Sequence, residues 1–359
     1  MSSTDAMSST DAVSSTDAVS GTDSVSSTDA VSTADSVSGT DSASTGAVGQ
    51  RPASGEQFVL TRGPARAVIG QVAAVLREFS IDGTHYTETW PDEQLPPMGC
   101  GIVLAPWPNR TEDGQWTAPD GSAQQLDITE VSRNTAIHGL LRNTVYRVVE
   151  QTPESVTLHA EVVPQHGWPF NLDTFVRYEL ADAGLLVTHT VTNRGAEPAV
   201  FGVGAHPYLR VGDTPVEQLT LQVTGATRAV TDKRFLPTGF EPVGNQGADL
   251  RDGALLGEVS CNDALTDFVA VAAPGGGERF EHRLSGPDGR TLTLWTDPDF
   301  RWAQVYTPPD FPGHGSDRRL AVAVEPMTCC ANALRSGRDL LTVQPGESWS
   351  ARWGLTPGD

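Results

Sequence analysis

The sequence has little lysine, little cysteine and no long apolar run. Lys233 is the only lysine among 24 basic residues, so covalent chemistry on a lysine amine has a single candidate. The four cysteines contain no C-x-x-C pair and are too few for a disulfide scaffold in 359 residues. We therefore expect buried thiols and no metal site.

Membrane and nucleic-acid partners are not expected either. No apolar stretch approaches the roughly 20 residues that a membrane-spanning helix needs, and no basic start with an apolar core marks a secretory signal. The formal net charge of −21 repels nucleic acid and anionic membrane surfaces. These features predict a cytoplasmic protein that binds neither.

The first fifty residues form an acidic repeat of their own. An aspartate recurs every six residues from Asp5 to Asp41, between serine, threonine and small apolar residues. The repeat has no basic and no aromatic residue, so it cannot bury enough surface to offset the entropy of ordering. We expect a disordered tail over residues 1–52 and one folded domain over residues 53–359.

The folded part shows short alternating segments separated by glycine, proline, asparagine and aspartate, and it lacks long helical periodicity. Such a pattern predicts an all-β protein, a large antiparallel β-sandwich whose curved sheet holds the binding groove. Only residues 331–340 could form a short helix, which Gly337 interrupts. The predicted strands are 155–162, 175–180, 185–192, 219–223, 291–295 and 302–307.

Two apolar runs each end in an ionisable residue followed by proline, and these residues are His206 and Glu325. The proline should turn the chain out of the strand and leave the side chain at a sheet edge or rim. An imidazole and a carboxylate are the groups that general acid/base catalysis needs. The alternative is structural, with His206 capping a loop and Glu325 paired with Arg318 or Arg319.

Three further segments carry groups that suit a sugar. In Ala105–Arg110 two prolines stiffen the loop that presents Asn109 and Arg110, although an ordinary turn with a solvated Arg110 is the alternative. His138 could bond a substrate hydroxyl or be a satisfied structural group. Trp168 lies in a tight connection, where an aromatic side chain either covers a pocket edge or packs beneath the loop.

In this order the motifs resemble the aldose 1-epimerase (galactose mutarotase) family over nearly all of residues 65–355. Ala105–Arg110 is similar to the family's Pro-x-x-Asn-Arg loop, and residues 137–139 are similar to its His-Gly motif. Residues 204–208 and 323–328 resemble the segments with the catalytic histidine and glutamate, the latter in the Glu-Pro-Met-Thr form of a bacterial branch.

The resemblance implies a β-supersandwich that interconverts the anomers of a free aldohexose without a cofactor. Glu325 would take the proton of the C1 hydroxyl while protonated His206 gives one to the ring oxygen. Asn109, Arg110 and His138 would contact the sugar hydroxyls. The family's hydroxyl-binding aspartate falls at Asn262 or Asp263, and strand alternation lets only one of them face the groove.

Two other functions stay open. A phosphorylated or sulfonated sugar would require converging basic residues, for which Arg142, Arg210 and Arg301 are candidates. A sugar-binding module without turnover would not need an acid and a base on one ligand. In each case the expected partner is a small monosaccharide, and the chain is expected to be a monomer or a homodimer.

Overall fold

The computed structural model describes residues 51–313 and 317–358. The predicted tail, residues 1–52, therefore lies outside the described residues except for its last two. Contacts group the described residues as one compact unit. In the described ranges, no helix is both long and apolar enough to span a membrane.

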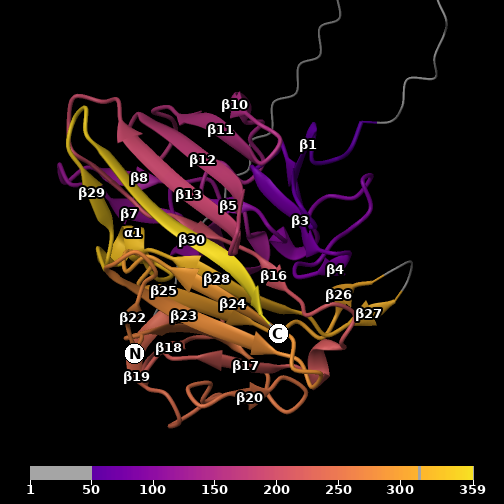
Figure 1. Ribbon diagram of the computed structural model, residues 1–359. Coiled ribbons are helices and arrows are strands. Elements are labelled where there is room, and N and C mark those ends of the chain that lie inside the picture. The colour runs from indigo at the N-terminus through magenta and orange to yellow at the C-terminus, as the bar shows by residue number, and fades with distance from the viewer. Residues whose placement is uncertain (1–50, 314–316, 359) are drawn as a thin grey trace, which may run out of the picture. The chain divides into compact units, whose positions relative to one another are not determined.

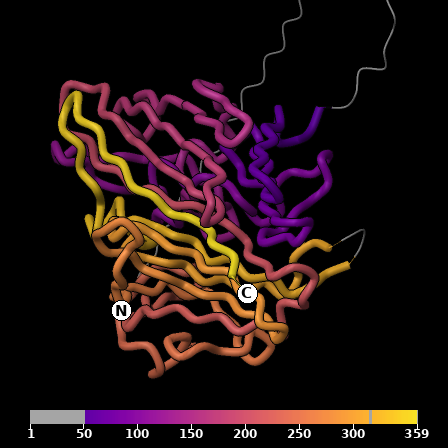
Figure 2. The backbone as a smooth tube through the Cα atoms, viewed as in Figure 1, coloured from indigo at the N-terminus to yellow at the C-terminus, as the bar shows by residue number. Residues whose placement is uncertain are grey.

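The larger sheet has ten antiparallel strands (Figure 1). The C-terminal strand, β30, lies between β13, of the hairpin β12–β13, and β24, as the yellow tube of Figure 2 shows. The spatial order is β10 (Arg147–Gln151), β11 (Ser155–Val162), β12 (Leu172–Ala181), β13 (Gly184–Asn193), β30 (Ser348–Gly358), β24 (Thr291–Thr296), β23 (Glu278–Ser285), β17 (Thr220–Val223) and β20 (Ala254–Leu255), with β22 (Val271–Ala272) beside β23.

A second, eight-stranded sheet carries the residues of greatest chemical interest. Its order is β19 (Pro237–Pro242), β18 (Thr227–Thr231), β21 (Asn262–Thr266), β25 (Trp302–Tyr306), β28 (Val322–Met327), β15 (Gly204–Ala205) and β5 (Val103–Leu104), with β16 (Tyr208–Leu209) beside β28. Its central strand, β28, is buried at every position.

Smaller elements complete the chain. A four-stranded sheet contains β1 (Gln57–Arg62), β2 (Ala65–Gly70), β3 (Val75–Ile81) and β4 (Thr84–His85). Four two-stranded pairs are β6 (Arg110–Glu112) with β9 (Thr135–Ile137), β7 (Gln115–Thr117) with β8 (Ala123–Gln125), β14 (Ala199–Phe201) with β29 (Leu341–Val343), and β26 (Phe311–Pro312) with β27 (Arg318–Arg319). The helices are α1 (Ala333–Ser336) and the 3-10 turns η1 (Pro97–Gly99), η2 (Val131–Arg133) and η3 (Val216–Gln218).

Alternation of side chains builds the core and confirms the all-β expectation. Successive residues of β12 are buried and half-buried in turn, as a sheet with one face in the core requires. Inner-face residues of both large sheets belong to one hydrophobic cluster, for example Val176 and Tyr178 from one and Val305 and Val324 from the other. The four cysteines are free and buried, as expected.

Every predicted strand overlaps an observed one, and β11 has the predicted bounds. The short predicted helix is also present as α1, which ends at Gly337 in a left-handed conformation. One detail was wrong, because Glu325 does not end its strand. β28 continues through Pro326 to Met327. On one side of β28 the neighbouring strand is interrupted between β15 and β16, so the missing proline N–H leaves no ladder bond unmade there.

Candidate active site

A polar cavity of about 430 Å³ lies over the eight-stranded sheet and collects most of the predicted site residues. Strands of that sheet, the loop after β5 and the η1 segment form its walls. The lining includes the predicted residues Asn109, Arg110, His138, His206, Asn262 and Glu325. It also includes Pro96, Met98, Gly99, Thr129, Glu130, Arg133, Ile137, Arg142, Gln304 and Tyr306.

His206 and Glu325 meet in this cavity. β15 pairs with β28, so the chain after Ala205 brings the His206 side chain alongside Glu325. The Nε2 atom of His206 lies 3.4 Å from Oε1 of Glu325, and the side chains are only 6% and 3% exposed. The structural alternative for Glu325 is wrong, because Arg319 donates two hydrogen bonds to Glu88 instead.

Burial sets the charge of this pair. It raises the pKa of Glu325 to about 8, against a smaller lowering by the Arg110 guanidinium. It lowers the pKa of His206 to about 4, with Arg110 and Arg142 adding to that decrease. At neutral pH the pair therefore holds one exchangeable proton, on Glu325, and both groups are uncharged.

His206 and His138 are held by stacking and by the backbone. The ring of Tyr208 stacks on that of His206 at 5.3 Å and an interplanar angle of 15°. His138 presents its ring edge-on at 5.4 Å, and its backbone N–H donates to the carbonyl of Asn109 at 2.9 Å. Burial and the neighbouring imidazole and guanidinium groups hold the pKa of His138 well below 6.5, so it is neutral. A neutral ring can both donate and accept a hydrogen bond from a hydroxyl.

Asn109 and Arg110 occupy the loop that the sequence singled out. Asn109 adopts a left-handed φ of 55°, which asparagine tolerates, and is 4% exposed. Arg110 is not solvated as the alternative proposed. It binds Glu130 with Nε and one terminal nitrogen at 2.7 and 2.9 Å, a bidentate pair that fixes the guanidinium plane.

Strand alternation decides between Asn262 and Asp263. Asn262 lines the cavity, and its amide oxygen accepts a hydrogen bond from Gln304 at 2.9 Å. Asp263 lies on the other face of β21 and pairs with Arg228 at 2.7 Å. Of the two alternatives that the sequence left open, Asn262 is therefore the one at the cavity, and Asp263 is not.

Trp168 is also removed from the candidate site. Its turn closes tightly, with the Trp168 N–H donating to the Gln165 carbonyl at 2.9 Å, and the indole folds inward. The side chain is fully buried, 5.8 Å from both Trp107 and Trp116. Packing beneath the loop, the alternative reading, describes it correctly.

Gln304 is the main residue that the sequence did not reveal. It stands directly opposite Glu325 in the pairing of β25 with β28. The strand 302–307 was predicted, but only the register with β28 shows that Gln304 and Tyr306 face the cavity. A pattern within one strand carries no information on that register.

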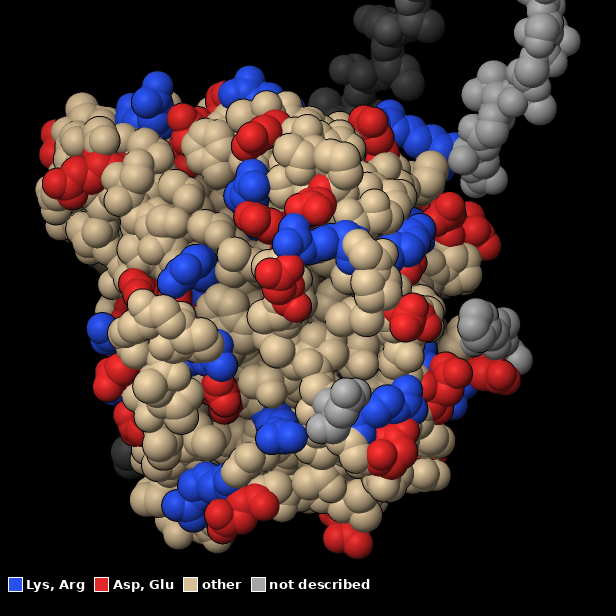
Figure 3. Space-filling view, viewed as in Figure 1, with Lys and Arg blue, Asp and Glu red and all other residues tan. Residues whose placement is uncertain are grey.

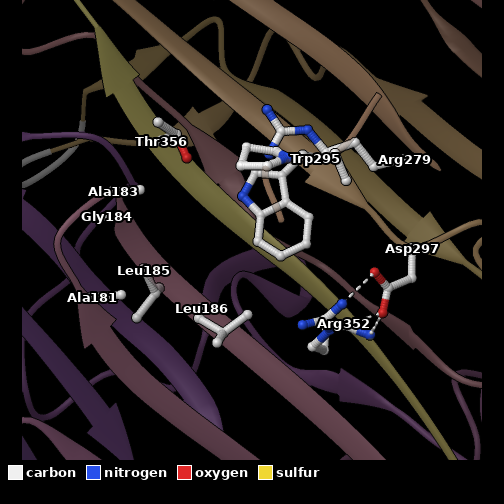
Figure 4. Close-up of a pocket in the computed structure, with 12 residues that line it drawn as sticks. Ala181, Ala183, Gly184, Leu185, Leu186, Arg279, Trp295, Asp297, Arg352 and Thr356 are labelled. Carbon is white, nitrogen blue, oxygen red and sulfur yellow. Dashed lines mark hydrogen bonds and ion pairs between the residues drawn. The ribbon is translucent and has the colours of Figure 1, made fainter. Parts of the chain in front are cut away.

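A second hollow shows a different lining. The one in Figure 4, about 240 Å³, lies over β13, β30 and β24 beside the Trp295 indole. Its Asp297 and Arg352 bind each other, and no histidine lines it in the part of the chain described. On the face in Figure 3, basic and acidic side chains are interspersed, without one continuous basic surface.

A possible metal-ligand group lies outside the cavity. Within residues 51–313 and 317–358, three potential ligands come together on β11 and β12, namely His159, Glu161 and Asp173. They are already engaged, since Arg147 donates to His159 at 2.8 Å and His159 lies 2.9 Å from Asp173. The polar cavity beside Glu325 contributes no member to this group.

Comparison with known proteins places this chain in a family. A sequence model of the family described as aldose 1-epimerase matches residues 56–356. The uncharacterized protein YihR of Escherichia coli (strain K12) is 32% identical over 295 residues, which are 82% of this chain and 91% of YihR.

Solved structures share the fold. The aldose epimerase homologue of C. elegans superimposes with a TM-score of 0.72 at 17% identity, covering 84% of this chain and 98% of that one. A galactose 1-epimerase from Lactobacillus acidophilus NCFM gives 0.67 at 17% identity, covering 84% and 95%. A galactose mutarotase-like protein from Clostridium acetobutylicum gives 0.71 at 19% identity, covering 84% and 95%.

Proposed function

Because the chain belongs to the aldose 1-epimerase family, we propose that it interconverts the α and β anomers of a free aldohexose. The observation that carries the proposal is the 3.4 Å approach of the His206 imidazole to the Glu325 carboxyl group in one polar cavity. An acid and a base on the same ligand are what ring opening requires. Only side-chain proton transfer is needed, so we propose no cofactor.

The proposed reaction conserves one proton on the pair. Glu325 accepts the proton of the C1 hydroxyl while His206 donates one to the ring oxygen, and the bond between C1 and the ring oxygen breaks. Rotation about C1–C2 and closure with the roles reversed give the other anomer. At neutral pH the proton lies on Glu325, so these roles require it to pass to His206 across the 3.4 Å contact before the ring opens.

Polar side chains around the pair would hold the sugar. We propose that Asn109, Arg110, His138 and Asn262 bond its hydroxyl groups, since all four line the cavity. Orientation of this kind can contribute as much to rate as the proton transfers themselves.

The test is the variant Glu325→Gln, which removes the base and keeps the shape. Anomer exchange of galactose or glucose, followed by NMR, should fall at least ~100-fold, while sugar binding measured by calorimetry survives. Exchange at the unmodified rate would reject Glu325 as the base. A chain that binds these sugars but never accelerates exchange would be the non-catalytic module instead.

Arg142 supports a second candidate function, epimerisation of a phosphorylated or sulfonated sugar. Arg210 pairs with Glu88 and Asp213, and Arg301 pairs with Asp339. Arg142 lines the cavity and, among the described residues, has no carboxylate partner; its hydrogen bond is to the Ile137 carbonyl at 3.4 Å. A guanidinium without a carboxylate suits an anionic substituent.

Substrate comparison separates the two functions. Exchange rates on galactose, glucose, glucose 6-phosphate and sulfoquinovose would be measured with the unmodified chain and with Arg142→Gln. A neutral-sugar enzyme accelerates exchange of the first two, and the substitution changes little. Acceleration confined to the charged sugars, lost in Arg142→Gln but kept in the control Arg194→Gln, would overturn the free aldohexose as substrate.

A further inference from the structure

A row of hydrogen-bonded side chains crosses the cavity beside Glu325. Arg110 donates its backbone N–H to the amide oxygen of Asn109 at 2.9 Å, and Asn109 donates its amide nitrogen to the oxygen of Gln304 at 3.1 Å. Gln304 in turn donates to the amide oxygen of Asn262 at 2.9 Å. The row connects the loop after β5 with β25 and β21.

The direction of these bonds follows from chemistry. An arginine side chain and a backbone N–H can only donate, so the group of Asn109 that faces Arg110 must be its oxygen. The Asn109 nitrogen then faces Gln304, whose oxygen must accept its hydrogen bond. The same reasoning turns the nitrogen of Gln304 toward Asn262, whose oxygen accepts.

Glu130 anchors the donor end of the row. Its carboxylate accepts from Arg110, from Arg133 at 2.9 Å and from the Thr135 hydroxyl at 2.7 Å. These bonds lower the pKa of Glu130 despite its partial burial, so it stays ionised and Arg110 stays in place. If any one of these amides were reversed, two donors or two acceptors would face each other at its contacts in the row.

Asn262 ends the row with its oxygen already used. Its amide nitrogen has no hydrogen-bond partner within the described part of the chain, and the residue lines the cavity. We propose that Gln304 is a positioning residue that fixes Asn262 as a hydrogen-bond donor, so that the substrate places an acceptor oxygen against it. This inference rests on the proposed function only in taking a sugar as the ligand of the cavity.

Gln304 suits this role because its side chain is buried and held in one orientation. The side chain is 7% exposed and lies beside Glu325 across the strand pair. Its oxygen and one hydrogen of its nitrogen are both committed to neighbours, so it cannot rotate without breaking two bonds. An aspartate at position 262 would accept the same bond from Gln304 but would present an oxygen to the substrate instead of N–H groups.

The inference is tested with sugar analogues that separate accepting from donating. A deoxyfluoro sugar keeps an acceptor where the hydroxyl was, and a deoxy sugar has neither function. Dissociation constants for each ring position of galactose or glucose, whichever binds better, would be measured by calorimetry. At one position the fluoro analogue should bind within about threefold of the parent and the deoxy analogue at least ~10-fold more weakly, because it leaves a donor unpaired.

Two substitutions should abolish this preference for the fluoro analogue over the deoxy analogue. In Asn262→Asp the fluoro analogue should bind as weakly as the deoxy analogue, while the parent hydroxyl, which can donate, still binds. In Gln304→Glu the carboxylate accepts from both neighbours, Asn262 turns its oxygen outward, and the preference is lost in the same way. The control Gln222→Glu, on β17, should leave the preference unchanged.

The result that would overturn the inference is equal weakening by fluoro and deoxy substitution at every position of the unmodified chain, or an unchanged preference in Asn262→Asp. Because binding is measured, failure of the proposed function gives a different result. A chain that shows the fluoro preference but no anomer exchange would contradict the proposed epimerase function and still support the donor role of Asn262.

Discussion

His206 and Glu325 are in contact, yet burial leaves both uncharged at neutral pH. Burying a charged pair costs the desolvation free energy of both groups. A neutral acid beside a neutral imidazole loses much less hydration and keeps a proton ready for transfer. Since the chemistry needs one proton on the pair, its pH range follows from the two pKa values.

Activity should have a bell-shaped pH profile between about 4 and 8. As the pH falls through about 4, His206 becomes protonated while Glu325 is protonated too, so neither group can act as the base. As the pH rises through about 8, Glu325 loses the only proton and no acid remains. The measurement is kcat/KM for anomer exchange from pH 3.5 to 9.5, corrected for the buffer-catalysed rate. A rate still rising above pH 9 would contradict this assignment.

The same burial predicts a stability difference. The folded-state pKa of Glu325 lies above its ordinary 4.5, so its contribution to stability is present below about pH 4.5 and is lost as the pH rises to about 8. Glu325→Gln should therefore have a higher free energy of unfolding than the unmodified chain at pH 8, by on the order of 4 kcal/mol, and a much smaller difference at pH 4.5. Urea unfolding at both pH values measures this. Equal differences at the two would show that the carboxyl group is not the cause.

At this scale the sequence predicted the groups that end conspicuous motifs. His206, Glu325, Asn109, Arg110 and His138 all line the cavity. A residue whose place depends on which face of a strand it occupies could not be assigned, as Asn262 and Asp263 illustrate. Trp168 shows the same limit, because a turn does not reveal whether its aromatic side chain points in or out.

At the scale of elements, Gly139 holds the His138 turn against the loop after β5. Gly139 has a φ of 73°, and a Cβ there would lie 2.0 Å from the carbonyl oxygen of Ala105. The backbone must therefore move apart to admit any side chain, and Asn109 and His138 would move with it.

Substitution at Gly139 should cost both stability and activity. Gly83 is the matched control, with a φ of 74° and open space around a Cβ. Gly83→Ala should lose only about 1 kcal/mol for the left-handed backbone and keep full activity. Gly139→Ala should lose more than about 3 kcal/mol and most of the exchange rate. Similar losses in the two variants would show that the close approach to Ala105 is unimportant.

Strands were predictable wherever the apolar pattern was local, as β11, β13 and β24 show. The bounds of β28 were not, because a proline normally ends a central strand. Pro326 is tolerated where the neighbouring strand is interrupted, and that interruption belongs to residues more than a hundred positions earlier in the chain.

For the whole molecule, the cavity is assembled from residues between Pro96 and Glu325. Deletion of residues 1–50 should accordingly leave kcat/KM for anomer exchange within about twofold of the full chain, because no residue of the cavity is removed. The comparison needs only the two purified proteins and one NMR assay. A larger loss would mean that the acidic repeat acts on catalysis.

The general architecture followed from composition and turn spacing, but the cavity did not. It exists because β15, β21, β25 and β28, drawn from well-separated parts of the chain, pair in one sheet. Such pairings depend on long-range register, which a single sequence does not encode in any local pattern.

Of the two proton-carrying side chains, Glu325 stands on β28, and His206 directly follows β15, the strand that pairs with β28. Their spacing is thus a property of the scaffold, while selectivity belongs to the surrounding loops and to the amide row. A search for altered sugar preference can leave β15 and β28 untouched and vary only what encircles them.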